Sequence, residues 1–385
     1  MNNFEFYNPT RIIFGEGKIS ELSKLVPENA KVLILFGGES AKKTGTLSEV
    51  EEALGSRQFD VFGGIEANPR YETLIKAVDK IENEGFDYLL AVGGGSVIDG
   101  VKFVSSAVNY SGDKWDIIMS NGSVITSALP FGTVLTLPAT GSEMNKGAVI
   151  TRENLKSKLA FMSDHIYPQF SILDPTKTYT LPTRQISNGV VDSFVHVIEQ
   201  YLTYPVNAYV QDAFAEGLLK TLIEIGPKAL KNPNNYDIRS NLMWTATLAL
   251  NGLIGVGVPQ DWSTHMLGHE ITALYDIDHA RTLAIILPAM LVERLPQKQD
   301  KLVQYAEKVW GITSGTPQEK AIKAIDNTRD FFETMQISTR FRDYELTHDV
   351  VEPLIKNLEA HNMVRLGEHA DITLDVSRRI YTNAL

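Results

Sequence analysis

The sequence contains no cysteine, and this absence removes several kinds of chemistry at once. Disulfide bonds, thiolate nucleophiles, cysteine-ligated zinc and iron–sulfur clusters all need a cysteine thiol, which the chain does not have. A reducing, cytoplasmic location fits a chain without disulfides. We expect a packed core to stabilise the fold, and 385 residues are enough to bury a large one.

Long apolar runs are also missing. The longest, around residues 283–292, contains Pro288 and is shorter than the roughly 20 apolar residues that span a bilayer. The N-terminal segment has neither the basic start nor the apolar stretch typical of a signal peptide. We therefore expect a soluble cytoplasmic protein with no membrane partner.

The chain has no excess of positive charge, because 36 basic residues stand against 47 acidic ones and give a net charge of −11. A negatively charged chain repels phosphate backbones, so we expect no nucleic-acid partner. The phosphates of a small cofactor remain possible ligands, because backbone N–H groups can bind them locally.

The hydrophobic periodicity changes near residue 182. Before it, short apolar runs alternate with stretches of helical period, which predicts a parallel sheet covered on both faces. We predict strands at 31–36, 59–62, 88–92 and 134–137, helices at 47–54, 71–84 and 96–108, and a hairpin of 148–151 with 158–162. After residue 182 we predict only helices, at 185–202, 208–225, 238–253, 263–275, 282–295, 301–309, 317–334 and 350–358.

This pattern predicts two domains. Residues 1–182 would form an α/β dinucleotide-binding domain with a Rossmann-like parallel sheet, and residues 183–385 an all-helical domain for metal binding and catalysis. Ligands in such proteins usually lie at the carboxyl ends of the strands and between domains.

Three glycines, Gly93 to Gly95, end the predicted strand 88–92. Glycine permits close approach of a ligand to the backbone, and Ser96 as an N-cap would leave the positive end of a helix free for a pyrophosphate. The Rossmann fingerprint is absent, because Ile98 stands where its last glycine would fall. A tight turn without a ligand is the alternative.

Two other segments are candidates for cofactor contacts. The strand 31–36 is followed by the turn Gly37, Gly38, Glu39 and Ser40, with two lysines just beyond it. An acidic residue at such a strand end binds the ribose of NAD, and its absence makes room for a 2′-phosphate, so this turn gives a mixed signal. Thr140 and Glu143 have the spacing of a capping box, which predicts a helix start or hydroxyls that contact a cofactor.

Four of the eight histidines fall within one stretch of the predicted helical half, at His196, His265, His269 and His279. Asp192 precedes His196 by four residues, and His265 precedes His269 by four, so each pair shares a helix face. One carboxylate and three imidazoles suit Fe(II) or Zn(II) better than Mg²⁺ or Ca²⁺, which prefer oxygen ligands. The alternative is a simple Asp192–His196 salt bridge.

Several long motifs in the same order resemble the iron-containing (group III) alcohol dehydrogenase family, in particular its butanol-dehydrogenase-type NADPH-dependent aldehyde reductases. The motifs are NPTRIIFG at 8–15, GGGSVID at 93–99, LPATGSE at 137–143, GVVDSFVHVIEQY at 189–201, LNGLIGVGVPQDWSTHMLGHE at 250–270 and DITLDVSRR at 371–379. The resemblance covers nearly the whole chain. It implies a dehydroquinate-synthase-like fold, a homodimer, and hydride transfer between NAD(P)H and short-chain aldehydes or primary alcohols.

The resemblance also implies roles for individual residues. It makes Asp192, His196, His265 and His279 the ligands of one Fe(II) or Zn(II) ion, and it places His269 near the nicotinamide and the substrate as a proton donor, with water as the alternative. The residues implied to contact the cofactor are Gly37, Gly38, Glu39, Ser40, Gly94, Gly95, Ser96, Asp99, Thr136, Thr140, Ser142 and Lys158.

Cofactor preference depends on two positions. Family members that use NAD usually carry an acidic residue near position 38, so Gly38 favours NADP(H) over NAD(H). NADPH-using relatives tend to have a glycine where this chain has Glu39. Two alternatives remain for the Glu39 side chain: it points to solvent, or it repels a 2′-phosphate.

Two other classes remain as alternatives. A lyase of the dehydroquinate-synthase type would need basic residues around the metal, and the segment between Asp192 and His279 has few. A non-catalytic metal-binding protein would not need a phosphate turn together with an open coordination site.

Overall fold

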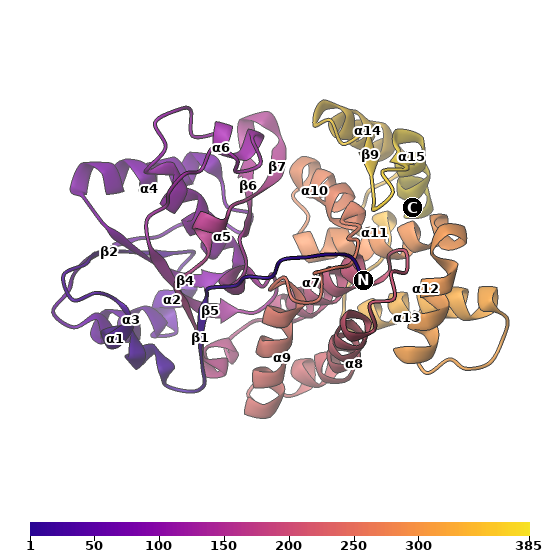
Figure 1. Ribbon diagram of the computed structural model, residues 1–385, viewed down its shortest axis with the longest axis horizontal. Coiled ribbons are helices and arrows are strands. Elements are labelled where there is room, and N and C mark those ends of the chain that lie inside the picture. The colour runs from indigo at the N-terminus through magenta and orange to yellow at the C-terminus, as the bar shows by residue number, and fades with distance from the viewer. The chain divides into compact units, whose positions relative to one another are not determined.

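The computed structural model describes the whole chain, residues 1–385 (Figure 1). The chain forms two compact units. One, the sheet unit, consists of residues 7–181 and 233–247, and the other, the helical unit, consists of residues 1–6, 182–232 and 248–385. The chain leaves the sheet unit between Leu181 and Pro182, and the segment 233–247 returns to it.

The sheet unit is built on six strands in the order β1-β8-β5-β4-β2-β3, and every neighbouring pair is parallel. The strands are β1 (Arg11–Phe14), β2 (Lys31–Phe36), β3 (Gln58–Phe62), β4 (Tyr88–Gly94), β5 (Phe131–Leu137) and β8 (Phe170–Leu173). Successive residues of β2 and β4 alternate between two buried cores, one on each face of the sheet. The predicted α/β fold with a covered parallel sheet is therefore confirmed.

Helices cover both faces of this sheet. The helices of the unit are α1 (Leu22–Leu25), α2 (Ser40–Lys43), α3 (Thr46–Leu54), α4 (Tyr71–Glu84), α5 (Gly95–Ala107), α6 (Asp116–Met119) and α9 (Tyr236–Ala249). Residues of α4 and α5 belong to one core, and residues of α1 and α3 to the other. The predicted hairpin is present as the antiparallel pair of β6 (Gly147–Arg152) and β7 (Ser157–Met162), and β6 packs beside α5.

Helix α9 completes the sheet unit, although it comes late in the chain. Its Met243 belongs to the same core as α4 and α5, and the Trp244 ring lies 6.3 Å from that of Phe14 on β1. At its C-terminal end the Thr247 hydroxyl donates to the buried Glu143 carboxylate over 2.5 Å. The sheet unit therefore depends on a segment made after the first helices of the other unit.

The helical unit contains α7 (Thr183–Tyr201), α8 (Tyr209–Lys231), α10 (Ser263–Tyr275), α11 (His279–Glu293), α12 (Leu295–Lys308), α13 (Pro317–Thr334), α14 (Val351–Ala360) and α15 (Leu374–Asn383), with a small ladder of β9 (Arg365–Leu366) and β10 (Ile372–Thr373). Helix α7 packs against α8 and α11, and α10 packs against α11 and α14. Every residue of α7 from Gly189 to Tyr201 is buried. None of the helices combines the length and the apolar character needed to cross a membrane.

Candidate functional site

The first part of the candidate site lies on the buried stretch of α7. Asp192 and His196 are 3% and 4% exposed, and the distance between Asp192 Oδ1 and His196 Nε2 is 3.8 Å. That distance is too long for a direct hydrogen bond. The two side chains lie within ion-pair distance, as the salt-bridge alternative predicts, but without the short contact of a direct hydrogen bond between these two atoms.

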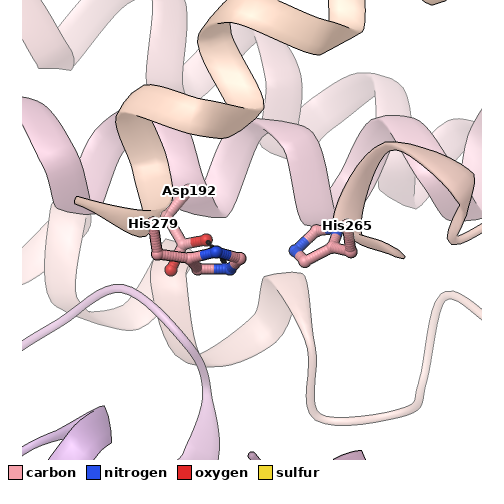
Figure 2. Close-up of side chains that lie close together, drawn as sticks. All are labelled: Asp192, His265 and His279. Atoms are coloured by element: carbon pink, nitrogen blue, oxygen red, sulfur yellow. Dashed lines mark ion pairs between the residues drawn. The ribbon is translucent and has the colours of Figure 1, made fainter. Parts of the chain in front are cut away.

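Two further histidines reach Asp192 from other helices. His265 lies in the first turn of α10, and His279 is the first residue of α11, where its Nε2 lies 3.7 Å from Asp192 Oδ1. Ligand atoms of Asp192, His265 and His279 all lie within 4.8 Å of one another. Figure 2 shows Asp192 beside His279, with the His265 ring facing them. This is the geometry of side chains that can share one ion.

His196 adjoins this group. Its ring stacks on the His265 ring, with centroids 4.6 Å apart, and its buried Nδ1 has no hydrogen-bond partner. Burial lowers the pKa of His196 to about 4, against a smaller opposite effect of Asp192, so the imidazole is neutral at neutral pH. Neutral imidazoles and a carboxylate are the donors that a borderline divalent metal takes. Three of the four predicted ligands, Asp192, His265 and His279, thus lie within metal-ligating distance of one another. His196 stacks beside them, and its role as the fourth ligand stays a prediction.

The fourth histidine of the cluster, His269, follows His265 by one turn of α10. Its ring lies 5.0 Å from that of His279 and 6.2 Å from that of His265, and it is buried. It is absent from the group of side chains within metal-ligating distance. His269 is therefore adjacent to the candidate metal site, and its proton-transfer role stays a prediction.

Trp262 marks the start of α10 with a left-handed backbone, φ 61°. A bulky residue in this conformation is strained, and such strain occurs often at functional sites. The indole lies 5.3 Å from the His265 ring and 6.2 Å from the His196 ring, and its N–H donates to Gln260 over 2.8 Å. It gives the histidine cluster an apolar aromatic neighbour.

Sequence reasoning missed Glu199. It follows Asp192 by seven residues on the same face of α7, it is 1% exposed, and its carboxylate contacts His265 Nδ1. The spacing i, i+4 and i+7 from Asp192 through His196 to Glu199 was the signal that could have revealed it.

A separate candidate site, for a cofactor, lies in the sheet unit at the carboxyl ends of the strands. Strands β2, β4 and β5 are neighbours and run parallel, so the turns that follow them meet at one edge. These are the segments 37–40, 93–96 and 137–142, which the sequence singled out separately. The carboxyl edge of a parallel sheet is where such folds bind their cofactors.

The glycine turn differs from its prediction in one respect. Helix α5 begins at Gly95, with Gly94 at the N-cap and no side-chain cap, so the prediction of Ser96 as N-cap was wrong. Close packing leaves no room for side chains at these two glycines. A Cβ on Gly94 would lie 2.9 Å from Leu137 Cβ, and one on Gly95 would overlap Thr140. The backbone N–H groups of the first turn have no side-chain cap, which suits an anion.

The capping-box prediction at Thr140 was also wrong. Only the short 3₁₀ turn η2 (Ser142–Met144) follows, and Thr140 Oγ1 instead accepts from the Ser142 N–H over 3.2 Å. Glu143 is buried and turns away to the hydroxyl of Thr247, and burial raises the pKa of its carboxyl. Glu143 is therefore held by a residue far away in sequence, and it does not take part in a helix start with Thr140.

A buried polar network connects α5 to this segment. The Ser142 hydroxyl donates to Asp99 Oδ1 over 2.6 Å, and Lys102 Nζ donates to Ser142 Oγ over 2.9 Å. Burial raises the pKa of Asp99 and lowers that of Lys102 to about 8. Lys102, which the sequence did not single out, thus holds two of the predicted cofactor residues in place.

The remaining predicted cofactor residues lie around this edge. Thr136 is half-buried near the end of β5, and Lys158 on β7 donates to Asn68 over 2.8 Å. Glu39 is exposed and forms a 3.5 Å ion pair with Lys42 on α2. Its carboxylate is therefore in solvent and partly neutralised.

The comparisons with known proteins agree with this geometry. Residues 9–175 match the family "Iron-containing alcohol dehydrogenase", and residues 186–383 match "Fe-containing alcohol dehydrogenase family, C-terminal". The chain is 57% identical, over 386 residues and 100% of both chains, to the NADPH-dependent aldehyde reductase YqhD of Escherichia coli K12.

Solved structures show the same fold. The crystal structure of YqhD from E. coli K-12 superposes with a TM-score of 0.99 at 56% identity, covering 100% of this chain and 99% of that one. The NADH-dependent butanol dehydrogenase A of Thermotoga maritima superposes with a TM-score of 0.95 at 32% identity, with coverage of 100% and 99%.

The chain belongs to the iron-containing alcohol dehydrogenase family, and it is an oxidoreductase of that family. The resemblance inferred from the sequence motifs is confirmed.

Proposed function

We propose that this protein reduces short-chain aldehydes to primary alcohols with NADPH, using one Fe(II) or Zn(II) ion. The observation that carries the proposal is the convergence of Asp192, His265 and His279 from three helices, with His196 stacked beside them. A divalent ion there would act as a Lewis acid on a carbonyl oxygen, and the nicotinamide would supply the hydride.

The side chains of this chain would divide the remaining work. The ion would be held by Asp192, His196, His265 and His279. All of these except His279 are buried, and the His279 side chain is 21% exposed. A substrate oxygen would therefore approach the ion from the side of His279. Trp262 supplies an apolar surface suited to a short alkyl chain. His269 or water delivers the proton to the oxygen of the reduced aldehyde.

The turns after β2, β4 and β5 would hold the dinucleotide. Gly94, Gly95 and Ser96 offer the first N–H groups of α5 to the pyrophosphate, and the buried Asp99–Ser142 pair fixes the adjoining segment. Thr136, Thr140 and Lys158 complete this edge.

NADPH is favoured over NADH on two grounds. The relative in E. coli is named as NADPH-dependent, and position 38 carries no acidic side chain. The Glu39 carboxylate is exposed and paired with Lys42, so it need not oppose a 2′-phosphate. The relative in T. maritima is named as NADH-dependent, so the preference needs a direct test.

We further propose that the enzyme works in the cytoplasm as a homodimer. The absence of cysteine supports a reducing compartment, and the dimer follows from the family resemblance.

The test is steady-state reduction of butyraldehyde with NADPH and with NADH, before and after removal of metal by a chelator. We expect a preference for NADPH, loss of turnover on chelation, and recovery with Fe(II) or Zn(II). Asp192→Ala should lower the bound metal and abolish turnover while leaving NADPH binding, measured by fluorescence titration, intact. Turnover equal to wild type in metal-loaded Asp192→Ala would refute the ligand assignment.

A further inference from the structure

Glu199 occupies an unusual position for an acidic residue. It lies on the same face of α7 as Asp192 and His196, one turn beyond the second of them, and it is 1% exposed. Buried carboxylates are rare unless they have specific partners. The partners of Glu199 lie on α10, more than sixty residues further along the chain.

Three contacts join Glu199 to the start of α10. Its Oε2 contacts Nδ1 of His265, and its Oε1 accepts a hydrogen bond from the Thr264 N–H over 2.6 Å. Its backbone carbonyl accepts from the Asp261 N–H over 2.9 Å. The segment 261–265 is therefore held to α7 by both the backbone and the side chain of one residue.

The contact to Nδ1 has a chemical consequence for His265. A neutral imidazole carries its proton on one nitrogen and a lone pair on the other. A carboxylate at Nδ1 favours the proton there, which leaves the lone pair on Nε2 for a metal. Because the same carboxylate also binds the adjacent backbone N–H, the orientation of the ring is fixed along with its tautomer.

We propose that Glu199 is a positioning residue for the metal site: it holds His265 in the Nδ1–H tautomer with Nε2 directed toward the ion shared with Asp192 and His279. This inference rests on the metal-dependent function proposed above. Glu199 itself contacts neither metal nor substrate, and it acts through His265.

A purely structural role is the competing explanation, because Glu199 also caps the N-terminus of α10. That helix has a second acceptor, however, since Asp261 Oδ1 accepts from the Ser263 N–H over 3.0 Å. Loss of a cap lowers the stability of the protein in any metal state. Loss of ligand orientation lowers metal affinity specifically, and the two roles can therefore be separated by measurement.

The experiment compares Glu199→Gln and Glu199→Ala with wild type as purified full-length protein. The glutamine has nearly the same volume but only one acceptor atom, whereas both neighbours, the Thr264 N–H and the His265 Nδ1–H, are donors. As a matched control, Gln200→Ala removes a buried neighbour on α7 that bonds only the carbonyl oxygens of His196 and Ala249.

Zn(II) affinity is measured on metal-free protein by competition with a chelator, and melting temperature is measured on the same metal-free samples. We expect the Glu199 variants to bind Zn(II) about 10- to 100-fold more weakly than wild type. Gln200→Ala should lower the melting temperature of the metal-free protein without a comparable loss of affinity.

A second readout needs no variant. Nitrogen-15 NMR of the zinc-loaded wild type reports the tautomer of each imidazole, and we expect His265 to carry its proton on Nδ1. An Nε2–H tautomer, or Glu199 variants that fold and bind Zn(II) as tightly as wild type, would overturn the inference. Failure of the wild type itself to bind Zn(II) or Fe(II) would instead overturn the proposed function, so the two failures are distinct.

Discussion

The close approach of α5 to the segment before η2 can be tested by adding a single methyl group. In Gly95→Ala the new Cβ would overlap Thr140 Oγ1 and would lie 2.6 Å from Thr140 Cγ2 and 2.9 Å from Thr140 Cβ. Rotation of the threonine side chain does not relieve the last contact, because Cβ does not move with that rotation. The backbone of one segment must therefore shift.

The size of the effect follows from the kind of contact. Overpacking of this sort costs about 1–3 kcal/mol, partly offset by about 0.4–1 kcal/mol because alanine restricts the unfolded chain more than glycine does. The shift also moves Thr140 Oγ1 away from the Ser142 N–H, and with it the hydroxyl that bonds Asp99. We expect a lower melting temperature and NADPH binding weakened by about tenfold, which corresponds to about 1.4 kcal/mol.

The assays are thermal unfolding of the metal-loaded protein and fluorescence titration with NADPH. Thr140→Gly in the same chain removes the atoms that clash, so the double variant should recover part of the stability lost by Gly95→Ala. Gly217→Ala on α8 is the control, since a Cβ there meets no atom within 4 Å and the residue lies away from the predicted cofactor contacts. Wild-type stability and NADPH affinity in Gly95→Ala, or a double variant less stable than the sum of the two single changes, would refute the reasoning.

Two further predictions concern the same edge of the sheet. A Cβ at position 38 meets no atom within 4 Å, so Gly38→Asp adds an acidic side chain without a clash at Cβ. Its charge should repel a 2′-phosphate, and the ratio of kcat/KM with NADPH to that with NADH should fall about tenfold or more. An unchanged ratio would place position 38 away from the cofactor. Lys102→Met removes a buried donor shared by Ser142 Oγ, Asn145 Oδ1 and Gly147 O and leaves Asp99 without its nearby cation. We expect a loss of about 1–3 kcal/mol in stability from the buried acceptors left without a donor, and weaker NADPH binding, with Zn(II) affinity unchanged. A melting temperature equal to wild type would contradict this account.

Much of the fold could be predicted because its longest elements have strong local patterns. The bounds predicted for α4, α10 and α13 equal those of the structure, and so do those of β2. These segments have either a clear amphipathic period or an uninterrupted apolar run. The fold class follows from the order of such elements, which is why it was correct although some boundaries differ by several residues.

The strands that were missed have weak local signals. Strands β1 and β8 are four residues each, and they are defined by pairing with each other and with β5. For these two strands the information lies in a partner far away in sequence. Helix α15 has only ten residues, but its apolar residues Val376, Ile380 and Tyr381 share one face, so its amphipathic pattern was a signal that the sequence reading overlooked.

The same distinction separates the site residues that were found from those that were missed. Asp192, His196 and His265 stand out because histidine and aspartate at i,i+4 spacing are uncommon on apolar helix faces. Glu199 and Lys102 do not stand out, because their partners are His265 and Ser142 on other segments. Ser96 and Thr140 were given capping roles from local spacing alone. In the structure the Ser96 hydroxyl accepts from the Asn68 N–H, and Glu143, the expected partner of Thr140, accepts from the Thr247 hydroxyl.

The late position of α9 bears on the order in which the protein can mature during its synthesis. Domains of nascent chains generally fold in order from the N-terminus. Here the sheet unit cannot close its core until Met243 has emerged from the ribosome, nor satisfy the Glu143 carboxylate until Thr247 follows. By then α7 and α8 have already been synthesised, so the sheet unit stays incomplete while the first helices of the helical unit are made.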